Sequence, residues 1–164
     1  MSVIVWITEG TWPACVAAAL ARTSPDEEIV LLYVNDDALA ETAHGAFAGL
    51  LGRGHRERDP GTRLEHLAAA SAHRLLQDAA DRLGRDCVRM ERAGRVEREV
   101  VLAAQGADLL VLARDGDRGR LGPHSLGPAT RFVVDHAPCP VLLVWPGEAP
   151  RTTLPPPPPP GHHH

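Results

Sequence analysis

The chain has 164 residues, 44% of them hydrophobic, which is enough for one domain with its own core but too little for two. Its formal net charge of -4 gives no long-range attraction to a polyanion, so a general nucleic-acid binder is disfavoured. Aromatic residues make up only 4% of the chain, which favours helices packed on a sheet over a β-sandwich.

The first residues, Met1 to Ile7, contain no basic stretch and are followed by the polar Thr8. This segment is too short for a signal peptide or a membrane span. We therefore expect a cytoplasmic protein with no membrane partner.

Segments with the length and the Val, Ile and Leu content of strands are Val3 to Ile7, Glu28 to Val34, Cys87 to Glu91, Asp108 to Ala113 and Val141 to Trp145. Four of them are nearly continuous apolar runs, typical of parallel strands covered by helices on both faces. The exception is the third, where Val88 and Met90 alternate with charged residues, as in a half-exposed edge strand.

Helical patterns lie between these strands. In the first, Thr11 is a candidate N-cap, Pro13 lies in the first turn, and the residues expected to face inward are Cys15, Val16, Ala19 and Leu20. A longer apolar stripe keeps helical spacing over about five turns. Its members are Leu64, Leu67, Ala68, Ala72, Leu75, Leu76, Ala79 and Leu83.

Two further helices are predicted in the second half of the chain. One carries Val96, Val100 and Ala104 and is expected to stop at Gly106. The other runs from about Pro128 to His136, with Ala129, Phe132 and Val133 inward. Because strand alternates with helix throughout, we expect right-handed βαβ crossovers in one parallel sheet.

Two segments fall outside this alternation. Asp36 to Gly61 is longer than an ordinary connection, and its apolar spacing from Leu39 to Leu51 predicts a short amphipathic helix followed by a polar loop, Gly52 to Gly61. Beyond Pro146 the chain is rich in proline, and Pro155 to Pro160 can only be extended. We therefore expect a domain over residues 1–146 and a disordered tail over residues 147–164, with a docking peptide as the alternative for the tail.

The loops that follow Ile7 and Ala113 are the candidate binding loops, because ligands of doubly wound sheets lie beyond the carboxyl ends of the strands. The loop from Ala113 to Gly127 is rich in glycine. Glycines let backbone N–H groups converge on a phosphate, and the helix that follows adds the positive end of its dipole. The same spacing also occurs in an ordinary flexible turn.

Other chemistries find little support in the sequence. A Walker A lysine motif and a G-x-S-x-G elbow are both missing, and the histidines are scattered, so we expect no catalytic residues and no metal site. We interpret Cys15, Cys87 and Cys139, which are far apart, as reduced and mostly buried thiols.

The segments Ala107 to Ala113 and His136 to Val144, with Leu126 and Gly127 between them, resemble the C-terminal half of a universal stress protein domain. The order of strands and helices extends the resemblance over roughly residues 1 to 145. It implies a doubly wound, five-stranded parallel sheet of order 3-2-1-4-5, a Rossmann-like α/β fold, and a homodimer. In one branch of the family it also implies an ATP site.

That ATP branch is marked by G-x2-G-x9-G-(S/T), an acidic turn after the first strand and a valine at the end of the second. Here the glycine positions fall on Ala113, Gly116 and Gly127 with one residue too many between the last two, and the Ser or Thr position falls on Pro128. The resemblance gives as candidate binding residues Thr8, Glu9, Val34, Ala113, Gly116, Gly119, Ser125, Gly127, Ala129 and Thr130.

These departures weaken the expected site. Pro128 removes a hydroxyl and a backbone N–H, and each lost hydrogen bond to a charged group costs about 1.5 to 3 kcal/mol, so two losses turn a micromolar site into a roughly millimolar one. Asp115 and Asp117 add negative charge to the loop, which its arginines, Arg114, Arg118 and Arg120, offset.

Three functions remain open. The first is a regulatory protein of stress adaptation that binds ATP or another adenine nucleotide, with Mg²⁺ as the companion ion, and signals to a protein partner. The second is a dimeric interaction module of the same fold that does not bind ATP tightly. The third, nucleotide hydrolysis, lacks a visible general base or metal cluster.

The last strand, Val141 to Trp145, has no polar alternation although the implied strand order places it at an edge of the sheet. An exposed apolar edge invites pairing with another strand. We therefore expect a homodimer in which this strand pairs antiparallel with its copy across a two-fold axis.

Overall fold

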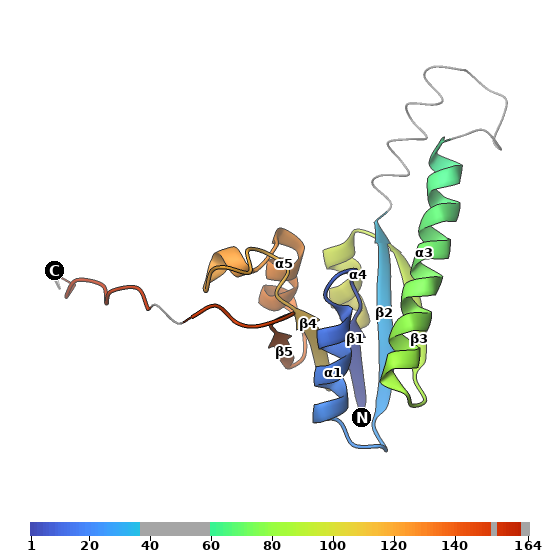
Figure 1. The fold of residues 1–164 in the computed structure, drawn as a ribbon, viewed down its shortest axis with the longest axis horizontal. Helices are drawn as coiled ribbons and strands as arrows, with labels where there is room; N and C mark the ends of the chain where they lie inside the picture. Colours follow the sequence, from blue (N-terminus) through green and yellow to red (C-terminus); the bar gives the residue numbers. More distant parts are fainter. Residues whose placement is uncertain (37–59, 152–153, 162–164) are drawn as a thin grey trace.

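The computed structural model describes residues 1–36, 60–151 and 154–161. Within these residues one sheet contains β1 (Ser2–Trp6), β2 (Glu28–Asp36), β3 (Val88–Gly94), β4 (Leu109–Ala113) and β5 (Val141–Val144). All pairs are parallel and the strand order is β3-β2-β1-β4-β5, which confirms the predicted doubly wound α/β fold (Figure 1). The expected helix from Leu39 to Leu51 lies outside the described residues.

Helices cover both faces of the sheet. Helices α1 (Trp12–Arg22) and α3 (Pro60–Leu83) pack on one face, and α4 (Val96–Ala103) and α5 (Pro128–His136) pack on the other. Successive residues of each strand alternate between the two layers, so Val5 packs on the α1 side while Ile4 and Trp6 pack on the α4 side. The continuous apolar runs of the sequence therefore belong to a sheet buried on both faces, as predicted.

The edge strand β3 is longer than the sequence pattern indicated. It runs from Val88 to Gly94, whereas the prediction was Cys87 to Glu91. Val88, the first residue of this edge strand, is 44% exposed. Met90 does pack against the core beside α4, so the edge strand is half-covered as expected.

The sequence predicted the N-cap residue of the first helix correctly, but the structure differs from expectation at the contact of its side chain and at Leu20. Thr11 occupies the N-cap position, but its hydroxyl pairs with the hydroxyl of Thr8 and makes no capping hydrogen bond. Leu20 was expected to face inward but is 42% exposed, because it lies in the last turn and borders an open hollow. The interior residues Cys15, Val16 and Ala19 are buried as predicted.

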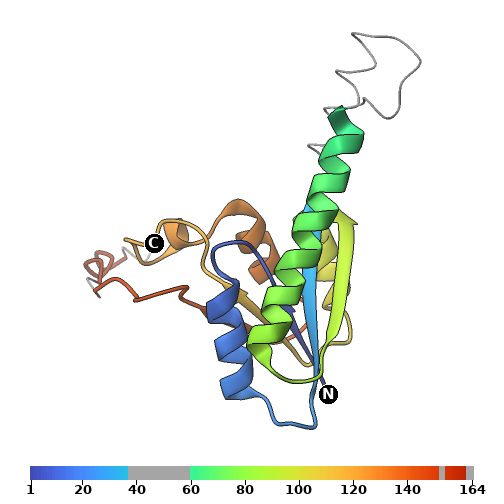
Figure 2. The ribbon, with the colours of Figure 1, turned by 45° about the vertical axis from the view of Figure 1, so that its right-hand side comes forward.

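Helix α3 extends beyond the sheet (Figure 2). It begins at Pro60, inside the stretch predicted as a polar loop. Among its residues whose side chains the structure describes, the buried ones lie in its second half, namely Ala72, Leu76, Ala79 and Leu83. The prediction that the whole apolar stripe faces the core is wrong at Leu67, which is 65% exposed, because the first half of the helix has no sheet beneath it.

The remaining elements follow the sequence closely. Helix α5 has the predicted bounds, and α4 ends at Ala103, three residues before the predicted stop at Gly106. Beyond Val144 the described residues form no helix or strand, and Pro155 to Pro160 are exposed. None of the helices in the described ranges has the length and hydropathy that a membrane crossing would need.

Candidate functional site

Loops from neighbouring strands meet at the carboxyl end of the sheet. Strand β1 lies between β2 and β4, so the turn after β1 is next to the end of β2 and next to the Gly-rich loop after β4. The guanidinium of Arg118 connects two of these loops, because its Nη2 donates to the carbonyl oxygen of Gly10 at 3.4 Å. This is the position in which a doubly wound sheet holds its ligand.

The turn after β1 is fixed by its own backbone. The carbonyl oxygen of Thr8 accepts the N–H of Trp12 at 3.1 Å, and Gly10 has a φ of 83°, a conformation that favours glycine. Glu9 is exposed at the tip of this turn. A carboxylate is thus presented to solvent at the edge of the candidate site.

Glu9 also borders a small hollow of about 160 Å³, lined by Tyr33 of β2 and by polar residues of α3 that include Arg74 and Asp78. Burial, followed by the negative charges of Glu9 and Glu91, raises the pKa of the Tyr33 hydroxyl. Tyr33 therefore stays protonated at neutral pH and offers a hydrogen-bond donor beside the Glu9 carboxylate.

The Gly-rich loop folds back on itself. The N–H of Gly116 donates to the carbonyl oxygen of Ser125 at 2.9 Å, and the N–H of Asp117 donates to that of His124 at 2.7 Å. A Cβ added to Gly116 would lie 2.4 Å from the His124 carbonyl oxygen, closer than real contacts allow. The close approach of the two arms of the loop therefore requires glycine at this position.

Two of the predicted hydroxyl groups are turned to the inside of the protein. Ser125 lies in the short 3₁₀ helix η2 (Pro123–Ser125) and is 1% exposed. Its Oγ donates to the carbonyl oxygen of Gly122 at 2.7 Å and accepts from Arg114. Thr130, in the first turn of α5, is also 1% exposed. The Ser125 hydroxyl therefore supports the loop, and both residues are buried away from solvent.

The N-terminus of α5 is held by an acidic side chain from the other arm of the loop. Gly127 is the N-cap residue, and its N–H donates to Oδ1 of Asp115 at 2.7 Å. A Cβ on Gly127 would lie 3.0 Å and 3.1 Å from the two carboxylate oxygens of Asp115, so the carboxylate rests directly against the glycine. Pro128 follows at the first helical position, where its missing N–H costs the helix nothing.

The backbone amides of the remaining candidate binding residues fall into two groups. The N–H of Gly119 donates to Oδ1 of Asp117 at 2.8 Å, within a turn of the loop itself. Ala129 and Thr130 lie in the first turn of α5, where backbone N–H groups have no partner inside the helix. Thr130 is 1% exposed, so of these two it is the Ala129 amide that the helix end offers to an anion.

Arg114 links the loop to the last strand. Its guanidinium stacks on the ring of Trp145, 4.7 Å from the ring centroid, and donates to Ser125. Its Nε is buried and has no hydrogen-bond partner. The cation–π contact and the hydrogen bond give this arginine a structural place between η2 and the end of β5.

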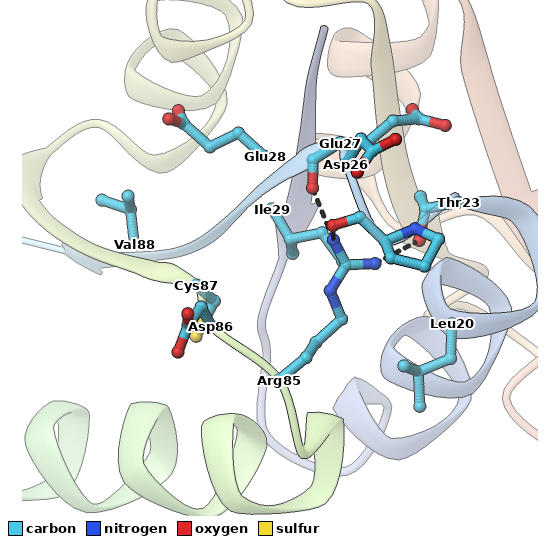
Figure 3. Close-up of a pocket in the computed structure, with 11 residues that line it drawn as sticks. Leu20, Thr23, Asp26, Glu27, Glu28, Ile29, Arg85, Asp86, Cys87 and Val88 are labelled. Atoms are coloured by element: carbon cyan, nitrogen blue, oxygen red, sulfur yellow. Dashed lines mark hydrogen bonds between the residues drawn. The ribbon is translucent and has the colours of Figure 1, made fainter.

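A wider hollow lies at the opposite end of the sheet (Figure 3). It has a volume of about 670 Å³, and Arg85 spans it. The guanidinium donates to Thr23 and to three carbonyl oxygens of the loop between α1 and β2, those of Ser24, Pro25 and Glu27. Because the hollow is at the amino ends of the strands and its arginine is fully used, we interpret it as a structural clamp.

The cysteines offer no reactive thiol at this site. All three are free, as predicted; Cys15 is buried, whereas Cys87 and Cys139 are only half-buried. Burial raises the pKa of Cys15 to about 12, and burial also raises the pKa of the other two. In the described part of the chain, His, Cys, Asp and Glu form no group of three or more that could hold a metal ion.

The structure thus brings most of the sequence-predicted positions together at one end of the sheet. Thr8 and Glu9 belong to the turn after β1. Ala113 is the last residue of β4 and is 7% exposed, and Val34 lies inside β2 and is 6% exposed. The sequence did not reveal that Asp115 reaches Gly127. A signal was available, because an acidic side chain is stabilised near a helix N-terminus.

Comparisons with known proteins agree with this architecture. The sequence model of the universal stress protein family matches residues 14–144. The chain folds as a doubly wound sheet of five parallel strands in the order β3-β2-β1-β4-β5. It belongs to the universal stress protein family. The comparison with curated proteins finds no match.

Solved structures share the fold at low sequence identity. The hypothetical protein MJ0577 has a TM-score of 0.67 at 16% identity, covering 90% of this chain and 97% of that one. The universal stress protein UspA from Lactobacillus plantarum has a TM-score of 0.58 at 21% identity, with 88% and 97% covered. A universal stress protein solved in complex with cAMP has a TM-score of 0.57 at 18% identity, with 90% and 98% covered.

Proposed function

We propose that this chain is a cytoplasmic regulatory protein of stress adaptation that binds an adenine nucleotide weakly at its Gly-rich loop. The observation that carries the proposal is the loop itself, whose backbone closes at Gly116 and leads into the N-terminus of α5 beside the turn after β1. Such a helix end attracts phosphate. The similar universal stress protein in complex with cAMP supports a nucleotide as the ligand class.

The two ends of a nucleotide would meet different groups. The amide of Ala129 and the exposed guanidinium groups of Arg118 and Arg120 suit the phosphates. The exposed carboxylate of Glu9 suits the ribose hydroxyls, which would donate to it. A companion Mg²⁺ would bind mainly to the phosphates.

Two features make the binding weak. Pro128 supplies neither an N–H nor a hydroxyl at the position where the ATP branch of the family has Ser or Thr. The N–H of Gly127 is already bonded to Asp115. Each missing hydrogen bond to a charged group costs about 1.5 to 3 kcal/mol, so the two bonds that Pro128 cannot make move a micromolar dissociation constant to about the millimolar range.

Calorimetric titration with ATP, ADP and AMP, with and without Mg²⁺, tests the proposal. We expect saturable binding with a dissociation constant of about 1 mM, and Glu9→Ala to weaken it by removing the acceptor for the ribose. Release of phosphate from ATP should stay at background, since we propose binding without turnover. Micromolar affinity would contradict weak binding, and no saturable heat would contradict nucleotide binding altogether.

A second function is favoured because backbone N–H groups of the Gly-rich loop form hydrogen bonds within the loop itself. The N–H groups of Gly116, Gly119 and Gly127 all bond to atoms of the loop. This suits a dimeric interaction module of the same fold that has given up nucleotide binding and acts through protein partners. An absence of saturable binding in the same titration would select this function.

In both cases we propose a homodimer that pairs through β5. All four residues of this edge strand are apolar and only half-buried in the single chain. The opposite edge strand, β3, exposes the charged Arg89 and Glu91, which discourage pairing. The contrast between the two edges selects β5 as the interface.

A further inference from the structure

The carboxylate of Asp115 lies where an anion would bind at the N-terminus of α5. Its Oδ1 accepts the N–H of Gly127 at 2.7 Å, and both its oxygens lie within about 3.1 Å of the place that a Cβ on Gly127 would take. The contact joins residues that are twelve positions apart, on opposite arms of the loop. Asp115 is thus an acidic side chain brought to the helix end from outside the helix.

We propose that Asp115 is an internal stand-in for the phosphate, and that it sets the affinity of the Gly-rich loop for anions. This inference rests on the proposed function, because it assigns the weakness of that binding to one side chain. A phosphate that approaches Gly127 must displace a carboxylate that is already hydrogen-bonded and already favoured by the helix dipole. It must also approach against the negative charge of that carboxylate.

Asp117 shows that the contact of Asp115 is more than ordinary turn geometry. The carboxylate of Asp117 accepts the N–H of Gly119, two residues further along, and pairs with Arg120 at 3.4 Å. That is the local turn that aspartate commonly forms. Asp115 instead reaches across the loop to the amide that begins α5. The two aspartates carry the same charge in the same loop but differ in which amide they cover.

This difference gives a matched experiment. Asp115→Ala uncovers the amide of Gly127 and removes one charge, whereas Asp117→Ala removes one charge and leaves Gly127 covered. Asp115→Asn keeps an oxygen for the Gly127 amide and removes only the charge. The dissociation constants of ATP and of inorganic phosphate are measured by calorimetry for the wild type and the three variants, with thermal unfolding as the check of folding.

We expect Asp115→Ala to lower the dissociation constant of ATP by at least about tenfold, the gain of one hydrogen bond to a charged group. Asp115→Asn should give part of this gain, and Asp117→Ala less than a third of it on a logarithmic scale. Equal gains from the two alanine variants would overturn the inference, since overall loop charge would then explain them.

The amide resonance of Gly127 gives a second readout that works even if Asp115→Ala folds poorly. In NMR titrations with inorganic phosphate, we expect this resonance to move at low millimolar concentration in Asp115→Asn and to move little in the wild type. Similar shifts in both proteins would contradict the inference.

Failure of this inference is distinguishable from failure of the proposed function. Weak ATP binding by the wild type that Asp115→Ala does not tighten overturns the inference alone. Binding by Asp115→Ala together with no binding by the wild type overturns nucleotide binding by the natural chain and upholds the role of Asp115. No binding by any variant overturns both.

Discussion

Two glycines of the Gly-rich loop differ in the space around them. A Cβ on Gly116 would lie 2.4 Å from a backbone carbonyl oxygen of the facing arm, whereas a Cβ on Gly119 would meet only the carboxylate of Asp117 at 3.3 Å. A side chain at Gly116 must therefore push the two arms of the loop apart. At Gly119 a small rotation of Asp117 gives enough room.

From this contrast we expect Gly116→Ala to destabilise the protein by about 1 to 3 kcal/mol, the usual cost of forcing extra atoms into a packed place. Gly119→Ala should change the free energy of unfolding by less than about 0.5 kcal/mol. Urea unfolding followed by circular dichroism measures both. Equal losses from the two variants would show that the arms of the loop are not held together as described.

For single residues, the sequence predicted which residues lie in the candidate site better than which atoms they contact. Gly116 and Gly127 were identified as members of a binding loop, and both lie at the carboxyl end of the sheet. The hydroxyl of Ser125 was expected to serve the site, but it is buried under Arg114. Which amide a side chain covers depends on how the two arms of the loop fold together, and spacing along the chain does not contain that information.

Helix α3 shows that side chains of one helix differ in their contribution to stability when only part of the helix packs on the sheet. Leu76 is 4% exposed in the half that packs on the sheet, and Leu67 is 65% exposed in the half that extends beyond it. Both belong to one apolar stripe with helical spacing, so the periodicity alone cannot separate them. The two leucines differ in burial because the sheet ends before the first half of the helix.

We therefore expect Leu76→Ala to cost about 2 to 5 kcal/mol of unfolding free energy, as for large residues truncated in a packed core. Leu67→Ala should stay within about 0.5 kcal/mol of the wild type, since it removes no buried contact within the chain. Chemical denaturation of the two variants makes the comparison. A large loss at Leu67 would mean that this side chain is covered in solution by something else.

For helices and strands, the sequence predicted where an element begins and ends better than how much of it packs against the sheet. Composition and periodicity placed four strands within two residues at each end and gave the bounds of α5. They failed at Leu20 and Leu67, because an amphipathic pattern states which face of a helix is apolar and not how far the partner surface extends. The strand order was predicted from the family resemblance, because hydrophobic periodicity does not indicate which strands are neighbours.

For the whole molecule, the two edges of the sheet give a prediction about assembly. We expect sedimentation equilibrium at micromolar concentration to give twice the mass of the chain. Leu143→Lys places a charge in the middle of β5 and should give a monomer, because charged side chains oppose edge pairing. Val88→Lys, on the exposed opposite edge, is the matched control and should remain a dimer. A monomeric wild type would rule out this interface.

The contact between Asp115 and Gly127 also affects how the protein depends on cellular metabolism. A protein whose loop is completed by a bound nucleotide gains stability as the nucleotide concentration rises, and a ligand present at its dissociation constant adds only about 0.4 kcal/mol. Here the chain itself supplies the carboxylate that completes the helix end. Its folded population should therefore stay nearly constant when starvation depletes the ATP pool, so that the protein persists under the conditions in which energy is scarce.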